Sequence, residues 1–171
     1  MKKILILTLI VGLFSTLNTS AQQDKSKRAS PPAKVSETIP SGATVSIDYS
    51  QPSVKGRTIG KEIAAYGEVW RTGANEATVF ETDKAVQVEG KSLPAGKYSL
   101  YTIPGEDKWT VIFNKTWKQW GTAYKEEDDA LRVDVKPAKA PATTEKMTFN
   151  IAKNGKVSLL WGDTEVDFQV K

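Results

Sequence analysis

The side chains best suited to bind a polar ligand fall in two stretches of the sequence, residues 48–57 (DYSQPSVKGR) and residues 67–78 (GEVWRTGANEAT). Arginine is scarce after Ala21, with four residues against eighteen lysines, yet Arg57 and Arg71 both lie in these stretches. The planar guanidinium of arginine binds a carboxylate or phosphate in a fixed geometry that lysine cannot match. The two stretches therefore predict a binding site for a small polar ligand, such as a sugar or an anionic group.

Neighbouring side chains would complete this site. Trp70 provides a flat face for stacking, Asn75 both a donor and an acceptor, and Glu76 a carboxylate. Because turn glycines stand close to both arginines, loops can project these side chains together around one concave surface. The predicted ligand-binding residues are Tyr49, Arg57, Trp70, Arg71, Asn75 and Glu76, with Tyr49 and Trp70 in the wall.

The same residues permit other interpretations. In a purely structural one, Arg71, Asn75 and Glu76 satisfy loop backbone groups and one another, and Trp70 belongs to the core. In another, Asp48 and Glu76 serve a small hydrolase of envelope or extracellular glycans, because glycosidases place two carboxyl groups around the scissile bond. In a third, the loops dock on another protein of the cell envelope. We favour a non-catalytic module that binds a polar ligand or glycan, or that is structural.

The composition excludes several kinds of catalytic site. The sequence contains no histidine and no cysteine, which removes the Ser-His-Asp triad, cysteine nucleophiles, and zinc or haem ligation by those residues. Residues 56–62 (GRTIGKE) are a residue short of a phosphate-binding loop and end in Glu where Ser or Thr is required. The acidic run 126–129 lacks the spaced ligands of a calcium loop. We expect no catalytic residue, no metal and no cofactor.

The first residues have the three parts of a secretory signal peptide, residues 1–21. Two lysines precede an apolar run, residues 4–17, and small residues follow up to Ala21. The run is about 14 residues, shorter than the about 20 that a membrane-spanning helix needs, which disfavours the alternative of a permanent anchor. We expect cleavage near Ala21, a flexible polar leader over residues 22–34, and a periplasmic or secreted protein with no membrane span in its mature form.

The rest of the chain, residues 35–171, has a suitable length for a single domain. Removing Lys2 and Lys3 from the 24 basic residues leaves 22, against 20 acidic residues, and hence a net charge of +2. That balance argues against nucleic acid as a partner, because nucleic-acid-binding proteins carry a clustered basic face. Without cysteine there are no disulfides, so stability must come from packing.

Six segments of the sequence, the first of which begins at residue 44, show a period of two. The period of two recurs in residues 44–50, 98–103, 108–113, 131–136, 145–151 and 165–170. Alternation is typical of half-buried antiparallel strands, and a segment that is apolar on both faces, as 98–103 is, indicates a central strand. Asn154-Gly155 predicts a type I′ hairpin turn. We predict an all-β fold, an antiparallel β-sandwich of about eight or nine strands.

Two features fall outside the strand pattern. Residues Lys61–Tyr66 (KEIAAY), followed by Gly67 as a C-cap, predict one short helix. Trp117 and Trp120, three residues apart, are either an exposed platform for stacking sugars or a cap on the end of the core. We favour the cap, because tryptophan is usually mostly buried.

Three segments carry a resemblance to a known family. YSQPSVKGR, YGEVWRTGANEATVFET and VEGKSLPAGKYSLYTIPGEDKWTVIFN resemble a bacterial family called domain of unknown function 2911, and WRTGANEAT is the most specific part. The similarity runs from about Ser30 to the C-terminus. It implies an exported, mostly β domain, and it assigns no catalytic residue.

Overall fold

A computed structural model of the chain describes residues 24–171, and the predicted signal peptide lies outside the described residues. Its strands are β1 (Pro32–Thr38), β2 (Thr44–Ser50), β3 (Thr78–Thr82), β4 (Val86–Val88), β5 (Lys91–Leu93), β6 (Gly96–Ile103), β7 (Trp109–Asn114), β8 (Asp129–Val135), β9 (Pro137–Ile151) and β10 (Lys156–Gln169). Two single-turn 3-10 helices complete it, η1 (Lys25–Lys27) and η2 (Glu126–Asp128). Within residues 24–171, no helix has the length and apolar character needed to cross a membrane.

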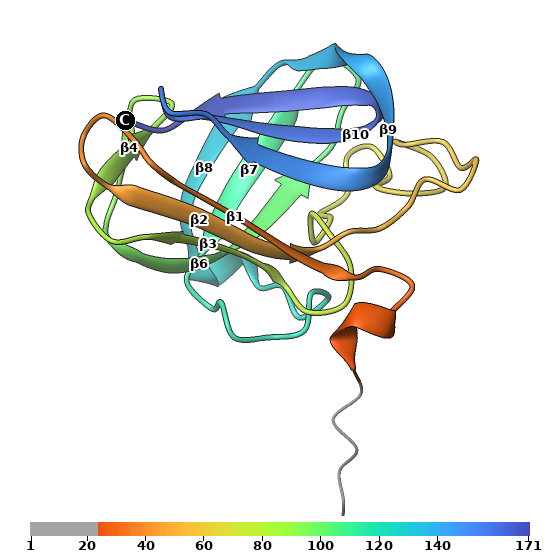
Figure 1. Cartoon of the computed structure of the whole chain (residues 1–171), viewed down its shortest axis with the longest axis horizontal. Helices are drawn as coiled ribbons and strands as arrows, with labels where there is room; N and C mark the ends of the chain where they lie inside the picture. Colours follow the sequence, from red (N-terminus) through yellow and green to blue (C-terminus); the bar gives the residue numbers. More distant parts are fainter. Residues whose placement is uncertain (1–23) are drawn as a thin grey trace, which may run out of the picture.

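The strands form a sandwich of two antiparallel layers (Figure 1). Six strands make one sheet in the order β1-β2-β3-β6-β7-β8, and the long β9–β10 hairpin lies across its face, while β4 and β5 pair with each other. Strand β6 lies between β3 and β7 and is buried on both faces from Tyr98 to Thr102, as its two apolar faces predict. The predicted all-β sandwich is confirmed, with ten strands in residues 24–171.

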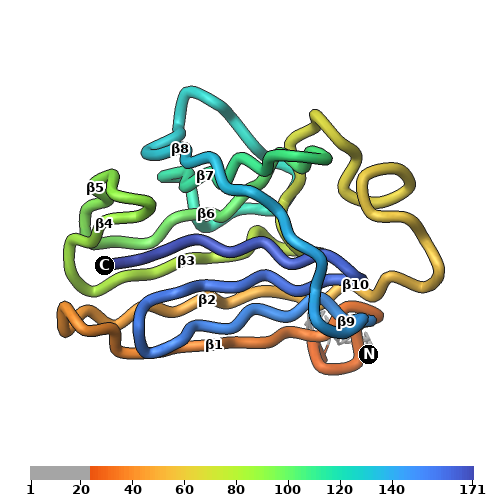
Figure 2. The backbone as a smooth tube through the Cα atoms, turned by 90° about the horizontal axis from the view of Figure 1, so that it is seen from above, coloured from red at the N-terminus to blue at the C-terminus, as the bar shows by residue number. Residues whose placement is uncertain are grey.

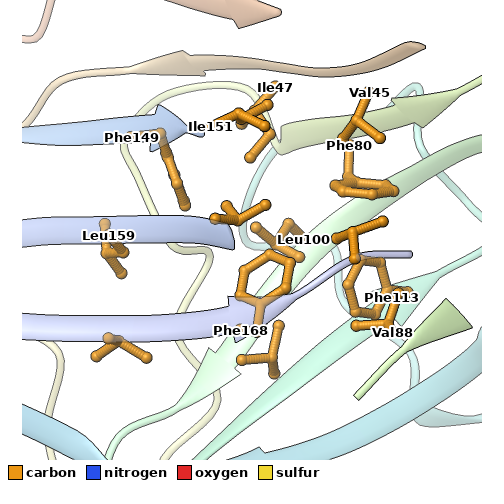
Figure 3. Packing of buried hydrophobic residues seen from close by; sticks show 14 of the residues in the cluster. Val45, Ile47, Phe80, Val88, Leu100, Phe113, Phe149, Ile151, Leu159 and Phe168 are labelled. Carbon is orange, nitrogen blue, oxygen red and sulfur yellow. The ribbon is translucent and has the colours of Figure 1, made fainter. Parts of the chain in front are cut away.

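The hydrophobic core fills the space between the sheet and the hairpin (Figure 3). Phe113 of β7 makes edge-to-face contacts with Phe80 of β3, at 5.0 Å between ring centroids, and with Phe168 of β10, at 6.0 Å. Val166, Phe168 and Val170 are buried, as the period of two predicts. Burial of these apolar surfaces is the main force that joins the two layers.

The predicted helix at Lys61–Tyr66 is wrong, because this segment is a series of turns. Ala64 has a left-handed φ of +48°, which a right-handed helix does not allow. The Glu62 carboxylate accepts a hydrogen bond from the backbone N–H of Thr58 at 2.6 Å, and this local bond holds the turn. So short a segment gains too few helical hydrogen bonds to resist such alternatives.

The predicted hairpin between β9 and β10 is confirmed, but its turn is not type I′. Gly155 has a φ of +85°, whereas Asn154 is not among the residues with positive φ. The Gly155 N–H donates to the Ala152 carbonyl, and the Ala152 N–H donates to the Lys156 carbonyl, both at 2.8 Å. A type I turn followed by a left-handed glycine accounts for this pattern.

The structure also differs from the flexible leader predicted over residues 22–34. Residues 32–34 are the first part of β1 and pair with Asp48–Ser50 of β2. Before them, Arg28 forms an ion pair with Glu76 at 2.7 Å. A second cation of this segment, Lys25, also pairs with Glu76, at 3.1 Å. The polar composition of the leader concealed these contacts, because they are made by backbone groups and charged side chains rather than by large apolar side chains.

Candidate functional site

The candidate site lies where two long connections meet at one end of the sandwich (Figure 2). Residues 51–77 join β2 to β3, and residues 115–128 join β7 to β8. The Gly121 N–H of the second connection donates a hydrogen bond to the Asn75 carbonyl of the first, at 3.0 Å. The two connections therefore form one braced unit rather than two independent loops.

The segment Trp70–Thr78 is fixed against strand β6. Trp70 exchanges two backbone hydrogen bonds with Thr102, at 2.7 and 2.9 Å. The buried hydroxyl of Thr72 donates to the hydroxyl of Thr102 at 3.1 Å. Thr72 also has a φ of +48°, an uncommon conformation for a β-branched residue that persists only where the surroundings enforce it. This backbone determines where Arg71 emerges.

Arg71 is half-buried and borders two pockets. Within residues 24–171, its guanidinium has no hydrogen-bond acceptor and no carboxylate partner, unlike Arg28 and Arg132, which each pair with a carboxylate at 2.7 Å. A partly buried cation without a partner is costly. The arrangement suits an anion that enters from solvent, because a guanidinium presents a planar fork of donors to a carboxylate or phosphate.

The first pocket, the tyrosine pocket, has a volume of about 410 Å³. Its lining includes Val69, Arg71, Tyr101, Gly121, Thr122 and Tyr124. Burial raises the pKa of the Tyr101 hydroxyl, while the charge of Arg71 acts to lower it. Tyr101 is thus a neutral phenol close to the arginine.

Tyr124 is locked in place on the wall of the tyrosine pocket. Its hydroxyl donates to Asp129 at 2.8 Å and accepts from Arg132 at 2.7 Å. Burial and the adjacent Asp129 carboxylate raise the pKa of Tyr124 to about 12. The ring therefore serves as a rigid, neutral wall.

The second pocket, the Arg57 pocket, shares Trp70 and Arg71 with the first and has a volume of about 340 Å³. Arg57, Trp70, Arg71 and Trp161 contribute to its lining. The Arg57 guanidinium donates to the carbonyls of its own turn, at 2.7 and 3.0 Å. Trp161 is 3% exposed, and its indole N–H has no acceptor within residues 24–171.

Trp70 lines both pockets and is part of an aromatic stack. Its ring lies parallel to that of Trp161, with centroids 5.0 Å apart and an interplanar angle of 5°. Trp109 meets it edge-on, at 6.4 Å. Trp70 packs against the core and lines the site at the same time.

Tyr49 and Glu76 lie in a third, smaller pocket of about 130 Å³, together with Asp48. Burial alone would raise the pKa of the Glu76 carboxyl, but its own backbone N–H and the side chains of Lys25 and Arg28 lower it to about 2. Their nitrogens lie 3.1 and 2.7 Å from the carboxylate oxygens. Glu76 is therefore a permanent anion at neutral pH.

The six predicted residues do not form one site. Arg57, Trp70 and Arg71 meet at one pocket. Tyr49 is mainly a core residue, which accepts a hydrogen bond from the Phe149 N–H at 3.0 Å, and it shares a separate pocket with Glu76. Asn75 fixes backbone, since its amide donates to the Ser30 carbonyl at 3.2 Å. It lines none of these pockets.

Sequence reasoning missed several residues that line these pockets, among them Tyr101, Gly121, Tyr124 and Trp161. The period of two places Tyr101 in a central strand without giving it a role, and no pattern in the sequence assigns Trp161 to the site. Gly121 and Tyr124 lie between Trp120 and the acidic run 126–129, where no motif indicates a site. A signal existed at Tyr101, because a polar aromatic side chain on the second face of a buried strand needs a hydrogen-bond partner, which Gln119 provides at 3.0 Å.

Comparison with known proteins assigns the family but no activity. The family model described as protein of unknown function (DUF2911) matches residues 30–170, so the chain belongs to this family. A segment of 70 residues, 40% of the chain, is 27% identical to the AP2/ERF and B3 domain-containing transcription factor RAV1 of Arabidopsis thaliana. The chain spans about a fifth of the length of that protein. No solved structure matches the chain.

Proposed function

We propose that this member of the DUF2911 family is an exported, non-catalytic module that binds a small anionic ligand through Arg71. The observation that supports the proposal concerns Arg71, a half-buried residue that borders two pockets and whose guanidinium has no partner within residues 24–171. An incoming carboxylate or phosphate would supply the missing charge and acceptors at once.

The surroundings of Arg71 favour binding over a purely structural role. Arg28 and Arg132 are structural arginines, since each is paired with a carboxylate of the protein. Arg71 differs from both, and its backbone is fixed by the Trp70–Thr102 pairing. A preorganised, unpaired cation loses little conformational entropy when a ligand binds.

The hydrolase alternative has less support. Glu76 and Asp48 do line one pocket, but Glu76 has a pKa of about 2 because Lys25 and Arg28 hold it as an anion. A general acid must carry a proton near the working pH. Glu76 therefore cannot protonate a leaving group at neutral pH.

The test is thermal unfolding of the exported protein with acetate, citrate, phosphate, and neutral and acidic sugars. We expect the melting temperature to rise with the concentration of an anionic ligand, since binding to the folded state stabilises it. Arg71→Met keeps the aliphatic stem and should abolish the rise, whereas Arg71→Lys should weaken it. Arg28→Lys, at an arginine with its own carboxylate, is the matched control and should leave the rise intact. No rise with any anion, or a rise unchanged in Arg71→Met, would overturn the proposal.

Export is also part of the proposal, on the basis of residues 1–21. Protein recovered from the periplasm should begin at or next to Gln22, which intact-mass spectrometry can establish. A chain that still begins with Met1 in the membrane fraction would contradict it.

A further inference from the structure

The Arg57 pocket has an excess of positive charge. Arg57 and Arg71 both line it, and no aspartate or glutamate of residues 24–171 does so. Glu62 lies close to Arg57 in the sequence, but its carboxylate accepts from the Thr58 N–H, and the acceptors of the Arg57 guanidinium are backbone carbonyls. Both positive charges are therefore without a carboxylate partner, and a ligand with a single negative charge would compensate only one of them.

The guanidinium of Arg57 is fixed but keeps free donors. Its Nε donates to the Val54 carbonyl at 3.0 Å and its Nη2 to the Ser53 carbonyl at 2.7 Å, which holds the side chain against its own turn. A guanidinium carries five N–H donors, and Nη1 of Arg57 donates to no group in the described part of the chain. Arg57 can thus bind a carboxylate with little further loss of side-chain entropy.

The two arginines are held by different parts of the fold. Arg71 follows Trp70, whose backbone pairs with Thr102 of β6, whereas Arg57 is held by its own turn. Two separately fixed guanidinium groups suit two carboxylates, because each can form a bidentate pair. The volume of the pocket, about 340 Å³, is near the lower end of the range for ligand pockets, about 300–1,000 Å³, so the ligand must be compact.

The Arg57 pocket also has an apolar wall. Ile63 and Trp70 both line it, and both are only partly buried, so their side chains can contact a ligand. Carbon atoms between the two anionic groups would cover this surface and remove it from water, which favours binding. The wall therefore favours an apolar carbon chain over one that carries hydroxyl groups.

The tyrosine pocket has less to offer such an anion. Arg71 is its single lining cation within residues 24–171. Tyr101 is 1% exposed and already accepts from Gln119, and the Tyr124 hydroxyl donates to Asp129. Because these phenols are committed to the protein, the tyrosine pocket lacks the second site of attachment that Arg57 provides.

The two most exposed tryptophans lie outside the site. Trp117 is 39% exposed and Trp120 is 52% exposed, which corrects the expectation that they cap the core. Neither lines a pocket that Arg71 borders. The indole that a ligand beside Arg71 can contact is that of the half-buried Trp70, which lines both pockets.

From these observations, and resting on the proposed function, we propose that the ligand is a compact dicarboxylate with an apolar carbon chain, bound in the Arg57 pocket. One carboxylate pairs with Arg71 and the other with Arg57, while the carbon chain lies against Ile63 and Trp70. Arg57 is then the residue that distinguishes dicarboxylates from monocarboxylates.

The experiment is calorimetric titration of the exported protein at neutral pH with adipate, hexanoate and galactarate. Hexanoate has the same chain length as adipate but lacks the second carboxylate, and galactarate has both carboxylates but a hydroxyl group on every carbon between them. We expect adipate to bind at least about tenfold more tightly than either. Equal binding of hexanoate would overturn the dicarboxylate, and equal or tighter binding of galactarate would overturn the apolar chain.

Arg57→Gln tests the second carboxylate. It should lower the affinity for adipate to that for hexanoate, a loss of at least about tenfold, and leave the affinity for hexanoate unchanged. Lys55→Gln removes a cation from the same turn that does not line the pocket, and as the matched control it should change neither affinity by more than about twofold. If Arg57→Gln weakens both acids equally, Arg57 acts through its turn and the inference is refuted.

A second pair of variants tests which pocket holds the ligand. Ser30 lines the Arg57 pocket but not the tyrosine pocket, and Thr122 the reverse. Ser30→Asp adds a competing carboxylate and should weaken adipate at least about tenfold, whereas Thr122→Asp should weaken it less than about threefold. Ser30→Asn, which has the size of the aspartate without its charge, should bind adipate normally. The reverse order of the two aspartates would place the ligand in the tyrosine pocket and overturn the inference.

The outcomes separate this inference from the proposed function. If adipate fails to bind while citrate or phosphate raises the melting temperature, and Arg71→Met abolishes that rise, anion binding stands and the dicarboxylate is wrong. The same conclusion follows if adipate binds through Arg71 with an affinity that Arg57→Gln does not change. If no anion binds, both proposals fail.

Discussion

Gly121 approaches Arg71 so closely that a Cβ atom on the glycine would stand 2.5 Å from the Cδ of the arginine and 2.9 Å from the Asn75 carbonyl oxygen. The absence of a side chain at Gly121 lets the two connections of the site come together. Because Gly121 has no side chain, the aliphatic stem of Arg71 can lie flat against its backbone. This contact directs the guanidinium toward the two pockets that Arg71 borders.

Gly121→Ala should therefore displace Arg71 and impair the site. We expect a loss of stability of about 1–3 kcal/mol, the usual cost of overpacking, and a larger relative loss of anion binding. Gly90→Ala is the control for binding, because no atom lies within 4 Å of its added Cβ and Gly90 lies outside the site; its positive φ of +77° makes the alanine costly to stability alone. Urea unfolding and titration with the same anion measure both effects. If Gly121→Ala binds the anion normally, the contact with Gly121 does not determine the position of the Arg71 side chain.

Glu76 predicts a specific pH dependence of stability. In the folded protein the pKa of Glu76, about 2, lies below the ordinary value of 4.5. The stability that the Glu76 carboxylate contributes is therefore fully present above about pH 4.5 and is lost as the pH falls towards 2. The side chain is 40% exposed, and solvent screening limits the contribution to about 1 kcal/mol or less. The difference in unfolding free energy between the wild type and Glu76→Gln should be constant above pH 5 and vanish near pH 2.

Glu81→Gln is a close control for Glu76→Gln. The Glu81 side chain has the same exposure, 40%, but its ion-pair partner within residues 24–171 is the single cation Lys97, at 3.2 Å. We expect only Glu76→Gln to speed amide hydrogen exchange in residues 24–31, because it releases Lys25 and Arg28. Unchanged exchange there would show that β1 alone holds this segment.

Strand β10 provides a test of the core. Phe168 is 3% exposed and contacts the ring of Phe113, so Phe168→Ala should cost about 3–5 kcal/mol. Asp167 lies on the opposite face, where it pairs with Lys156 at 2.9 Å on the surface, and Asp167→Ala should cost well under about 1 kcal/mol. Chemical denaturation measures both changes. Similar losses would contradict the assignment of the two faces.

The strands could be predicted because their signal is local. Side chains two residues apart on one strand share a face, so the burial of Val166 and Phe168 follows from spacing alone. The wrong prediction of a helix at Lys61–Tyr66 was also a local inference. There, the hydrogen bond from the turn to Glu62 and the left-handed φ of Ala64 outweigh the helix propensity of the segment.

The site could be predicted only in part, because convergence depends on contacts between distant residues. Arg57 and Arg71 do reach one pocket. Glu76 is drawn away by Arg28, which precedes it by 48 residues, and no periodic pattern encodes that pair. No local pattern pairs Tyr101 with Gln119, which lies 18 residues later in the chain and donates to its hydroxyl at 3.0 Å.

Thr72 offers the last test, because its conformation and its hydroxyl both hold the backbone next to Arg71. Thr72→Val keeps the shape but leaves the buried hydroxyl of Thr102 without the partner that lies at 3.1 Å. We expect a loss of about 1–3 kcal/mol, the cost of an unsatisfied buried polar group, and weaker anion binding. Thr110→Val is the control, since the Thr110 hydroxyl donates to the exposed carboxylate of Asp134 and its removal should cost under about 1 kcal/mol. If Thr72→Val loses stability but binds anions normally, the segment Trp70–Thr78 braces the fold without positioning Arg71.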